Sequence, residues 1–273
     1  MLSSREAVGR TCAEATTTTL VDETCLDGAA LKPKEIDFDR AHEVPLGTFT
    51  VDYEGQEHVP DAATLERLAA SREIRVTVPV RADGFDPLGD HSRLDALPET
   101  VETVFVAGNP AYLDDHELER AVAPCLGAAV EQSTNAWVGT EGIERLALAT
   151  GATQFELLSR STQRTVRGLR AAGFGGEVAV YAPTVLTDDE DDILDAVGAY
   201  VSRRKPVARA LPEDAPTDST ATGRARSVLL AAANDYALVG SRDDVHEQVR
   251  AMREVGVDTV VGYPARGLDE FVA

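Results

Sequence analysis

Hydrophobic and polar positions repeat along most of the chain, with a short apolar run followed by an amphipathic stretch. The clearest run is Thr103 to Ala107 (TVFVA), which is nearly continuous in apolar residues, as in a parallel sheet buried on both faces. Further strands of this kind are expected at Glu73 to Val80, within Ala128 to Val138, at Ala152 to Leu158 and at Glu177 to Tyr181. Such runs, alternating with helices, predict an α/β fold.

Helical spacing fills the stretches between these strands. Helices are expected from a cap at Asp61 to Ala70, from Asp114 to Leu126, from Thr140 to Thr150 and from Ser161 to Ala172. The last unit is the most complete. Ser241 and Asp244 form a capping box, Gly256 ends the helix, and Val257 to Val261 is the final strand.

Two of these units resemble each other directly. The stretch RGLRAAGFGGEVAVYAP from Arg167 and the stretch RAMREVGVDTVVGYP from Arg250 both run from an amphipathic helix through a glycine to an apolar strand and a proline. A repeated helix–strand unit predicts a (β/α)8, TIM-barrel-like fold for residues 1–273 as one domain. Between the two units, residues 211–226 are rich in Pro, Asp, Ser and Thr and predict a flexible surface loop.

The N-terminal half follows this pattern less closely. Thr16 to Val21 (TTTTLV) is a β-branched run that predicts a strand, and Cys25 to Leu31 is a second short strand or the turn into one. Gly47 to Val59 alternates apolar and polar residues around Glu54-Gly55, which predicts a hairpin that decorates the barrel. Eight strands can be counted only if one early segment contributes two; otherwise the barrel is partial or the sheet is open.

The charge balance changes the picture of partners. The 47 Asp and Glu residues outnumber the 26 Lys and Arg residues, and the only lysines are Lys32, Lys34 and Lys205. A surface this acidic repels itself unless molar salt screens it, which indicates a halophile. No basic stripe is present for nucleic acid or an anionic membrane, and no apolar run reaches the roughly 20 residues of a membrane span. We therefore expect a cytoplasmic protein.

Three stretches carry a resemblance to a known family. Ala237 to Pro264 resembles the C-terminal signature of the bacterial luciferase-like family, while Asn135 to Leu158 and Glu177 to Val201 are similar to two of its upstream units in the same order. Within that family the second half is most similar to the deazaflavin-dependent methylenetetrahydromethanopterin reductases. The chain thus resembles a diverged haloarchaeal member.

The resemblance implies a (β/α)8 barrel that binds FMN or coenzyme F420 at the C-terminal ends of its strands and transfers hydride to a small molecule. The first half departs from the family pattern, because no early strand followed by an acidic or histidine-bearing loop is identified there. The alternative is a luciferase-like barrel without a cofactor that acts as a binding or partner subunit. The partners expected are therefore a small-molecule cofactor or substrate, and a homo-oligomer remains open.

Candidate cofactor-binding residues follow one predicted strand. In the resembled family, the loop equivalent to Gly139, Thr140 and Gly142 cradles the cofactor phosphate; alternatively, Thr140 caps its helix, Gly139 permits a turn, and the Glu141 carboxylate repels a phosphate. Trp137, the only tryptophan, lines the ring pocket or belongs to the packed rim. Asn135 binds a ligand or forms a turn. The same alternatives hold for four further residues at strand ends, namely Asn109, Tyr181, Thr184 and Tyr263.

No catalytic residue and no metal site is assigned from the sequence. The five histidines lie in predicted loops and on polar helix faces, without a nucleophile nearby, and His246 is expected at the surface. Asp188 to Asp192 (DDEDD) lacks the ligand spacing of a cation site and predicts a solvated helix start. Three widely spaced cysteines, Cys12, Cys25 and Cys125, indicate buried free thiols.

Overall fold

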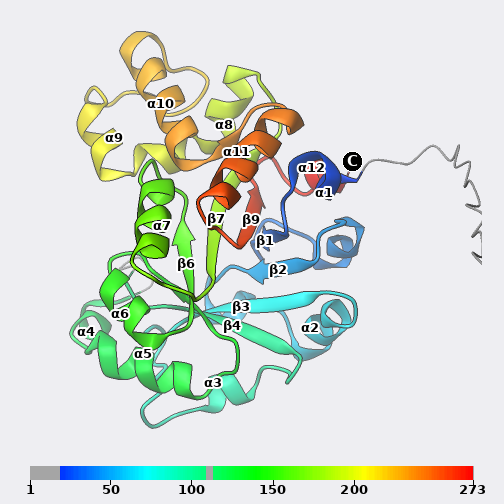
Figure 1. Ribbon diagram of the computed structural model, residues 1–273, viewed down its shortest axis with the longest axis vertical. Helices are drawn as coiled ribbons and strands as arrows, with labels where there is room; N and C mark the ends of the chain where they lie inside the picture. The colour runs from blue at the N-terminus through cyan, green and yellow to red at the C-terminus, as the bar shows by residue number, and fades with distance from the viewer. Residues whose placement is uncertain (1–18, 109–112, 273) are drawn as a thin grey trace, which may run out of the picture.

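Eight parallel strands hydrogen-bond side by side in a closed ring within the residues that the computed structural model describes, 19–108 and 113–272 (Figure 1). Around the ring the order is β1–β2–β3–β4–β5–β6–β7–β9, and β9 pairs with β1 to close it. The ring strands are β1 (Gly28–Leu31), β2 (Thr48–Val51), β3 (Glu73–Pro79), β4 (Val101–Val106), β5 (Trp137–Gly139), β6 (Thr153–Leu157), β7 (Val178–Val185) and β9 (Thr259–Pro264). The two-residue β8 (Leu238–Val239) pairs with the last two residues of β7, past the part of β7 that pairs with β6. The predicted (β/α)8 barrel is confirmed.

Helices connect the strands and cover the outside of the ring. They are α2 (Ala62–Ala69), α3 (Ser92–Asp95), α4 (Asp115–Leu118), α5 (Val122–Glu131), α6 (Glu144–Thr150), α7 (Thr162–Ala171) and α11 (Arg242–Glu254). Short helices near the two ends and in the early loops are α1 (Leu20–Thr24), η1 (Phe38–Glu43), η2 (Gln56–His58) and α12 (Asp269–Val272). As predicted, Asp61 caps α2, and Ser241 with Asp244 forms a capping box on α11.

A group of three helices stands apart from this ring of helices. These are α8 (Glu190–Ser202), α9 (Lys205–Ala210) and α10 (Gly223–Tyr236), inserted between β7 and β8. Figure 1 shows them together at the end of the molecule toward which the arrowheads of β6 and β7 point. They share a small apolar core of their own that includes Leu194, Val201 and Leu229. The group, called here the α8–α10 cap, therefore lies over the carboxyl end of the barrel.

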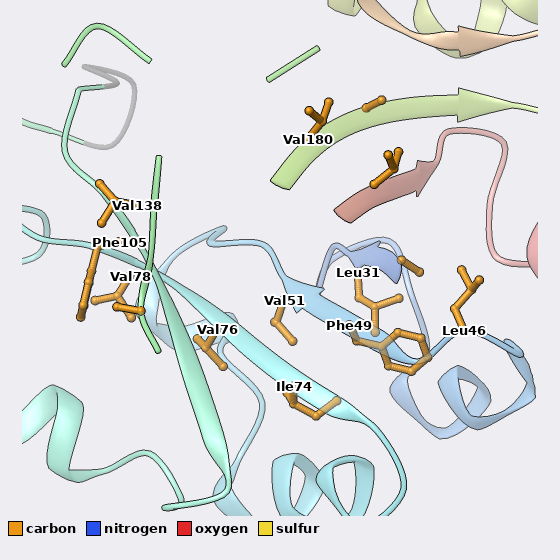
Figure 2. Packing of buried hydrophobic residues seen from close by; sticks show 14 of the residues in the cluster. Leu31, Leu46, Phe49, Val51, Ile74, Val76, Val78, Phe105, Val138 and Val180 are labelled. Atoms are coloured by element: carbon orange, nitrogen blue, oxygen red, sulfur yellow. The ribbon is translucent and has the colours of Figure 1, made fainter. Parts of the chain in front are cut away.

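Side chains of each strand alternate between two cores. On β3, Ile74, Val76 and Val78 belong to the large core between strands and helices, where Figure 2 shows them beside Val51 and Phe105. The intervening positions of the strands face the barrel interior, which is filled by a separate cluster that includes Trp137, Phe155 and Tyr181. Because burial on both faces makes a strand apolar throughout, the long central runs could be identified from sequence.

The hairpin predicted for Gly47 to Val59 is wrong. Only Thr48–Val51 is a strand, and it lies between β1 and β3 in the ring, parallel to both. The polar positions that suggest a solvent face, Thr48 and Thr50, are buried. Gly55 has a φ of 117° and leads into η2 rather than into a second strand. The alternation thus reflects threonines buried within the sheet, and this segment supplies a ring strand.

The strand predicted for Thr16 to Val21 is also wrong over the part that the structure describes, residues 19–21. Leu20 and Val21 begin α1, because Thr19 and Asp22 form a capping box that outweighs the β-branched composition; residues 16–18 lie outside the described residues. The alternative of a strand within Cys25 to Leu31 is confirmed as β1.

Other boundaries also differ from the sequence-based expectation, and α6 begins at Glu144 rather than at Thr140. The helix expected from Asp114 to Leu126 is split into α4 and α5, and α5 continues to Glu131. The last four residues of the loop predicted at 211–226 are already helical, since α10 begins at Gly223. No helix among the described residues is long and apolar enough to cross a membrane.

Candidate functional site

A cavity of about 780 Å³ opens at the carboxyl ends of the barrel strands, beneath the α8–α10 cap. Its walls come from residues that end β1, β2, β4, β5, β6, β7 and β9, together with one face of α8. Small side chains at Gly108, Gly139 and Ala196 leave the space open. A volume of this size falls within the roughly 300–1,000 Å³ of typical ligand sites. The cavity is therefore the candidate functional site.

Asp52 is the carboxylate directly after β2 and lines this cavity. The residue is half-buried, and burial raises the pKa of its carboxyl from 3.8 to about 7. The Tyr181 hydroxyl donates a hydrogen bond of 3.1 Å to Asp52 Oδ2, and together with nearby Lys32 it limits the rise. Asp52 therefore exchanges its proton near neutral pH, as a general acid or base does.

Tyrosines form the wall beside Asp52. The rings of Tyr181 and Tyr263 lie nearly parallel with their centroids 6.5 Å apart. Lys32 Nζ lies 3.8 Å from the Tyr263 ring centroid and pairs with Glu35 at 3.4 Å. Burial, followed by the hydrogen bond from its hydroxyl to Glu35, raises the pKa of Tyr263 above its ordinary value. Both phenols therefore stay protonated at neutral pH and present flat, apolar faces.

Arginines lie on the opposite side of the cavity, at the junction of α8 and α9. Arg204 stacks on Tyr200 with 4.5 Å from its guanidinium carbon to the ring centroid, and it donates a hydrogen bond to the Tyr200 hydroxyl. Its Nη1 lies 3.3 Å from Glu141 Oε1, in the loop after β5. Arg203, the preceding residue, also lines the cavity and is exposed. The contacts with Tyr200 and Glu141 fix the Arg204 guanidinium between α8 and the loop that follows β5.

Comparison with known proteins adds a family. A family model described as "Family of unknown function (DUF7388)" matches residues 21–271. The chain belongs to this family, DUF7388. Nothing among the curated proteins matches it.

Solved structures similar to the DUF7388 chain include two F420-dependent enzymes. The coenzyme F420-dependent tetrahydromethanopterin reductase from Methanopyrus kandleri superimposes with a TM-score of 0.58 at 14% identity, covering 90% of this chain and 95% of that one. An F420-dependent secondary alcohol dehydrogenase, in complex with an F420–acetone adduct, gives a TM-score of 0.57 at 11% identity, covering 90% and 96%. At such low identity these likenesses show the fold, a TIM-barrel-like α/β fold shared with F420-dependent enzymes.

The predicted cofactor loop of the DUF7388 chain is only partly at the cavity. Gly139 and Thr140 line it, as does Glu141. Thr140 does not cap a helix, because α6 begins later, at Glu144, and has Ile143 as its N-cap. The Thr140 backbone N–H donates 3.0 Å to the Phe155 carbonyl, so this donor is already occupied. The Glu141 carboxylate, expected to repel an anion, is paired with Arg204.

The other predicted residues lie away from the cavity walls. Trp137 points into the barrel interior, with its ring centroid 5.3 Å from that of Phe155 and its face 4.1 Å from the Arg75 guanidinium. Asn135 has a φ of 56° and donates 3.1 Å to Glu102, a turn-forming role before β5. Gly142 has a φ of 74° and lies outside the lining residues. A role for these three in cofactor binding remains a prediction.

Of the remaining residues considered from the sequence, some line the cavity and others do not. Tyr181 and Tyr263 line the cavity, whereas the Thr184 hydroxyl is buried and donates to the Ala182 carbonyl. Asn109 and Cys12 lie outside the described residues. His246 is half-buried rather than at the surface, with Nδ1 3.6 Å from Cys25 Sγ; Cys125 is buried. Asp189 caps α8, which confirms the predicted helix start.

Sequence reasoning missed the ionisable residues of the cavity. Asp52 lies in the segment assigned to a hairpin, Lys32 follows the four-residue β1, and Arg204 lies between α8 and α9. One signal was present: Lys32 is one of three lysines in a chain whose other fixed cations are arginines. Assigning Thr48–Val51 to the barrel would also have placed Asp52 at a strand end, where barrel enzymes carry their sites.

Proposed function

We propose that this DUF7388 protein is a luciferase-like oxidoreductase that binds F420, or FMN in its place, in the cavity at the strand ends and transfers hydride to or from a small molecule. The observation that carries the proposal is Asp52, a half-buried carboxyl that lines a ligand-sized cavity and whose pKa burial raises to about 7. The fold shared with two F420-dependent enzymes supports the choice of cofactor. An open cavity also favours this function over a barrel without a ligand site.

The residues present fit a flat tricyclic ring. Phe155 and Leu157 on β6 and the stacked Tyr181 and Tyr263 give the cavity apolar walls. Gly139 and Thr140 supply small side chains on the far side, and Glu141 beside them is neutralised by its ion pair. Aromatic faces and small side chains are what a planar ring system needs for close contact.

When bound, a reduced deazaflavin or flavin supplies a hydride to a carbon atom of the substrate. Asp52 would supply the proton: its carboxyl O–H would donate to the oxygen of a carbonyl substrate, the product would be an alcohol, and Asp52 would be left as a carboxylate. The hydrogen bond from Tyr181 stabilises that carboxylate. In the reverse direction the Asp52 carboxylate accepts the proton from the alcohol.

The test is a titration of the protein with F420 and with FMN, following Trp137 fluorescence at several KCl concentrations. Trp137 is the only tryptophan and lies just below the cavity, so a bound chromophore that overlaps its emission quenches it. We expect saturable quenching at micromolar concentration by one of the two. D52N should bind the same cofactor and reduce a panel of aldehydes and ketones about 100-fold or more slowly. Absence of quenching by both cofactors, in protein shown to be folded, refutes the proposal.

A further inference from the structure

The two sides of the cavity differ in chemistry. On the strand side, Asp52 and the tyrosine rings form a region where a proton can be exchanged. On the cap side, Arg203 and Arg204 face the same space from the junction of α8 and α9. A ligand that fills the cavity therefore meets an acid at one end and two guanidinium groups at the other.

The charge of the cavity differs from that of the chain. Across the sequence, 47 acidic residues stand against 26 basic ones, whereas the lining holds three of each kind. The acidic three are Glu35, Asp52 and Glu141, and the basic three are Lys32, Arg203 and Arg204. Glu35 and Glu141 are already paired with Lys32 and Arg204, respectively. With Asp52 ionised the lining is neutral, and it becomes positive as Asp52 takes up a proton, because burial raises the pKa of that carboxyl to about 7. The cavity is therefore far less acidic than the chain as a whole.

Arg204 is held ready for an additional acceptor. Tyr200 and Tyr236 flank its guanidinium at 4.5 and 5.6 Å from their ring centroids. A guanidinium has five N–H donors, and the Glu141 carboxylate and Tyr200 hydroxyl occupy only part of them. Arg203 makes no ion pair with a carboxylate among the described residues, although the chain holds 47 acidic residues. Planar guanidinium groups suit carboxylates and phosphates.

We propose that Arg203 and Arg204 hold an anionic group, a carboxylate or phosphate, of the small molecule bound in this cavity. This inference deepens the proposed function by naming the class of ligand. It rests on the proposed function only in assigning the reacting end of the ligand to Asp52. The anion has two sources, the side chain of the cofactor or the substrate itself. In either case the anionic end lies against the cap and the opposite end faces Asp52.

The test compares R203Q and R204Q with R209Q. Arg209 is an exposed arginine on α9 that lies outside the lining, so R209Q makes the same charge change without touching the cavity. The first arm measures dissociation constants for FMN against riboflavin, and for F420 against its riboside, which lack the anionic side chain. The second arm measures binding of levulinate and of its neutral amide to the cofactor-loaded protein. Circular dichroism checks that each variant is folded.

If the anion belongs to the cofactor, R203Q weakens FMN or F420 about threefold and R204Q about tenfold, while riboflavin and the riboside are unchanged. If it belongs to the substrate, cofactor affinities stay constant and levulinate weakens by similar factors, while its amide does not. Both effects should shrink as KCl is raised. If no anionic probe binds more tightly than its neutral counterpart, or if R203Q and R204Q behave like R209Q, the inference is wrong.

The outcome is separable from the proposed function. Binding of levulinate that depends on Arg203, in a protein that binds neither F420 nor FMN, overturns the oxidoreductase and retains the anion site. The opposite result is that R203Q, R204Q and R209Q change neither a tight affinity for the cofactor nor the affinity for levulinate. That result retains the cofactor site and overturns the anion inference.

Discussion

Substitution of Asp52 by Asn should change how stability depends on pH, with or without a ligand. The pKa of Asp52 is about 7 in the folded protein, against an ordinary value of 3.8, and burial is the main cause. Between those two values the folded chain holds a proton that the unfolded chain releases. The free energy of unfolding therefore falls as pH rises through this window, by at most about 1.4 kcal/mol per pH unit, and then levels off above the folded pKa.

D52N has no carboxyl to ionise, so this contribution disappears. Relative to the wild type, D52N should gain about 2.5 kcal/mol between pH 5 and pH 8, because the wild type alone must bury a carboxylate at the higher pH. The measurement is urea unfolding at fixed KCl at four pH values, compared as a difference so that groups common to both proteins cancel. A difference that stays constant within about 0.5 kcal/mol across this range would refute the raised pKa.

Tyr181 provides a matched control. Its hydrogen bond lowers the pKa of Asp52, so Y181F should raise that pKa further and extend the fall in stability to higher pH. The same change predicts activity: carbonyl reduction by the wild type should decline above about pH 7 as Asp52 loses its proton, and by Y181F at higher pH. A pH profile that is unchanged in Y181F would separate Asp52 from the proton transfer.

Three further substitutions test the barrel and its loops. In G108A the new methyl would lie 1.8 Å from the Glu141 carbonyl oxygen, so the free energy of unfolding in denaturant should fall by about 3 kcal/mol. As a control, the methyl of G127A on α5 meets nothing within 4 Å, and the free energy of unfolding should rise by up to about 1 kcal/mol. R75M removes the buried guanidinium that pairs with both Glu73 and Glu102, and leaves Glu102 with only its hydrogen bond from Asn135. It should lose about 3 kcal/mol, with partial recovery in R75M/E102Q. S241A removes the α11 cap and should lower unfolding free energy by about 1 kcal/mol.

The second half of the fold could be predicted because its elements are long and follow one period. The α7–β7 and α11–β9 units were identified from apolar spacing and glycine stops, and the structure places β7 and β9 side by side. The first half begins with two four-residue strands, β1 and β2, and β2 alternates threonine with apolar residues although both of its faces are buried. In so short a segment, the pattern of a buried strand cannot be distinguished from that of an edge hairpin.

The site was predicted less well than the fold, for a related reason. Gly139 and Thr140 were found because a strand–loop–helix order marks them, and both line the cavity. Trp137 was assigned to the strand exit, yet one residue of register decides whether a side chain faces the barrel interior or the helices. Arg204 was not considered, because its position depends on stacking against Tyr200 and Tyr236, contacts that arise only when α8, α9 and α10 pack together.

The order of strands in the closed ring explains why missing β2 in the sequence also meant missing Asp52, the candidate acid. In sequence, Asp52 and Tyr181 lie in different halves of the chain, but the ring runs β2–β1–β9–β7, so β2 is only three steps from β7. Tyr181 on β7 can therefore reach across the barrel mouth to the residue that follows β2, and their hydrogen bond of 3.1 Å joins the two halves. Interpreted as a surface hairpin, the same segment leaves the ring open and Asp52 in solvent, with an ordinary pKa. Missing the four residues of β2 thus also missed the site residue that directly follows them.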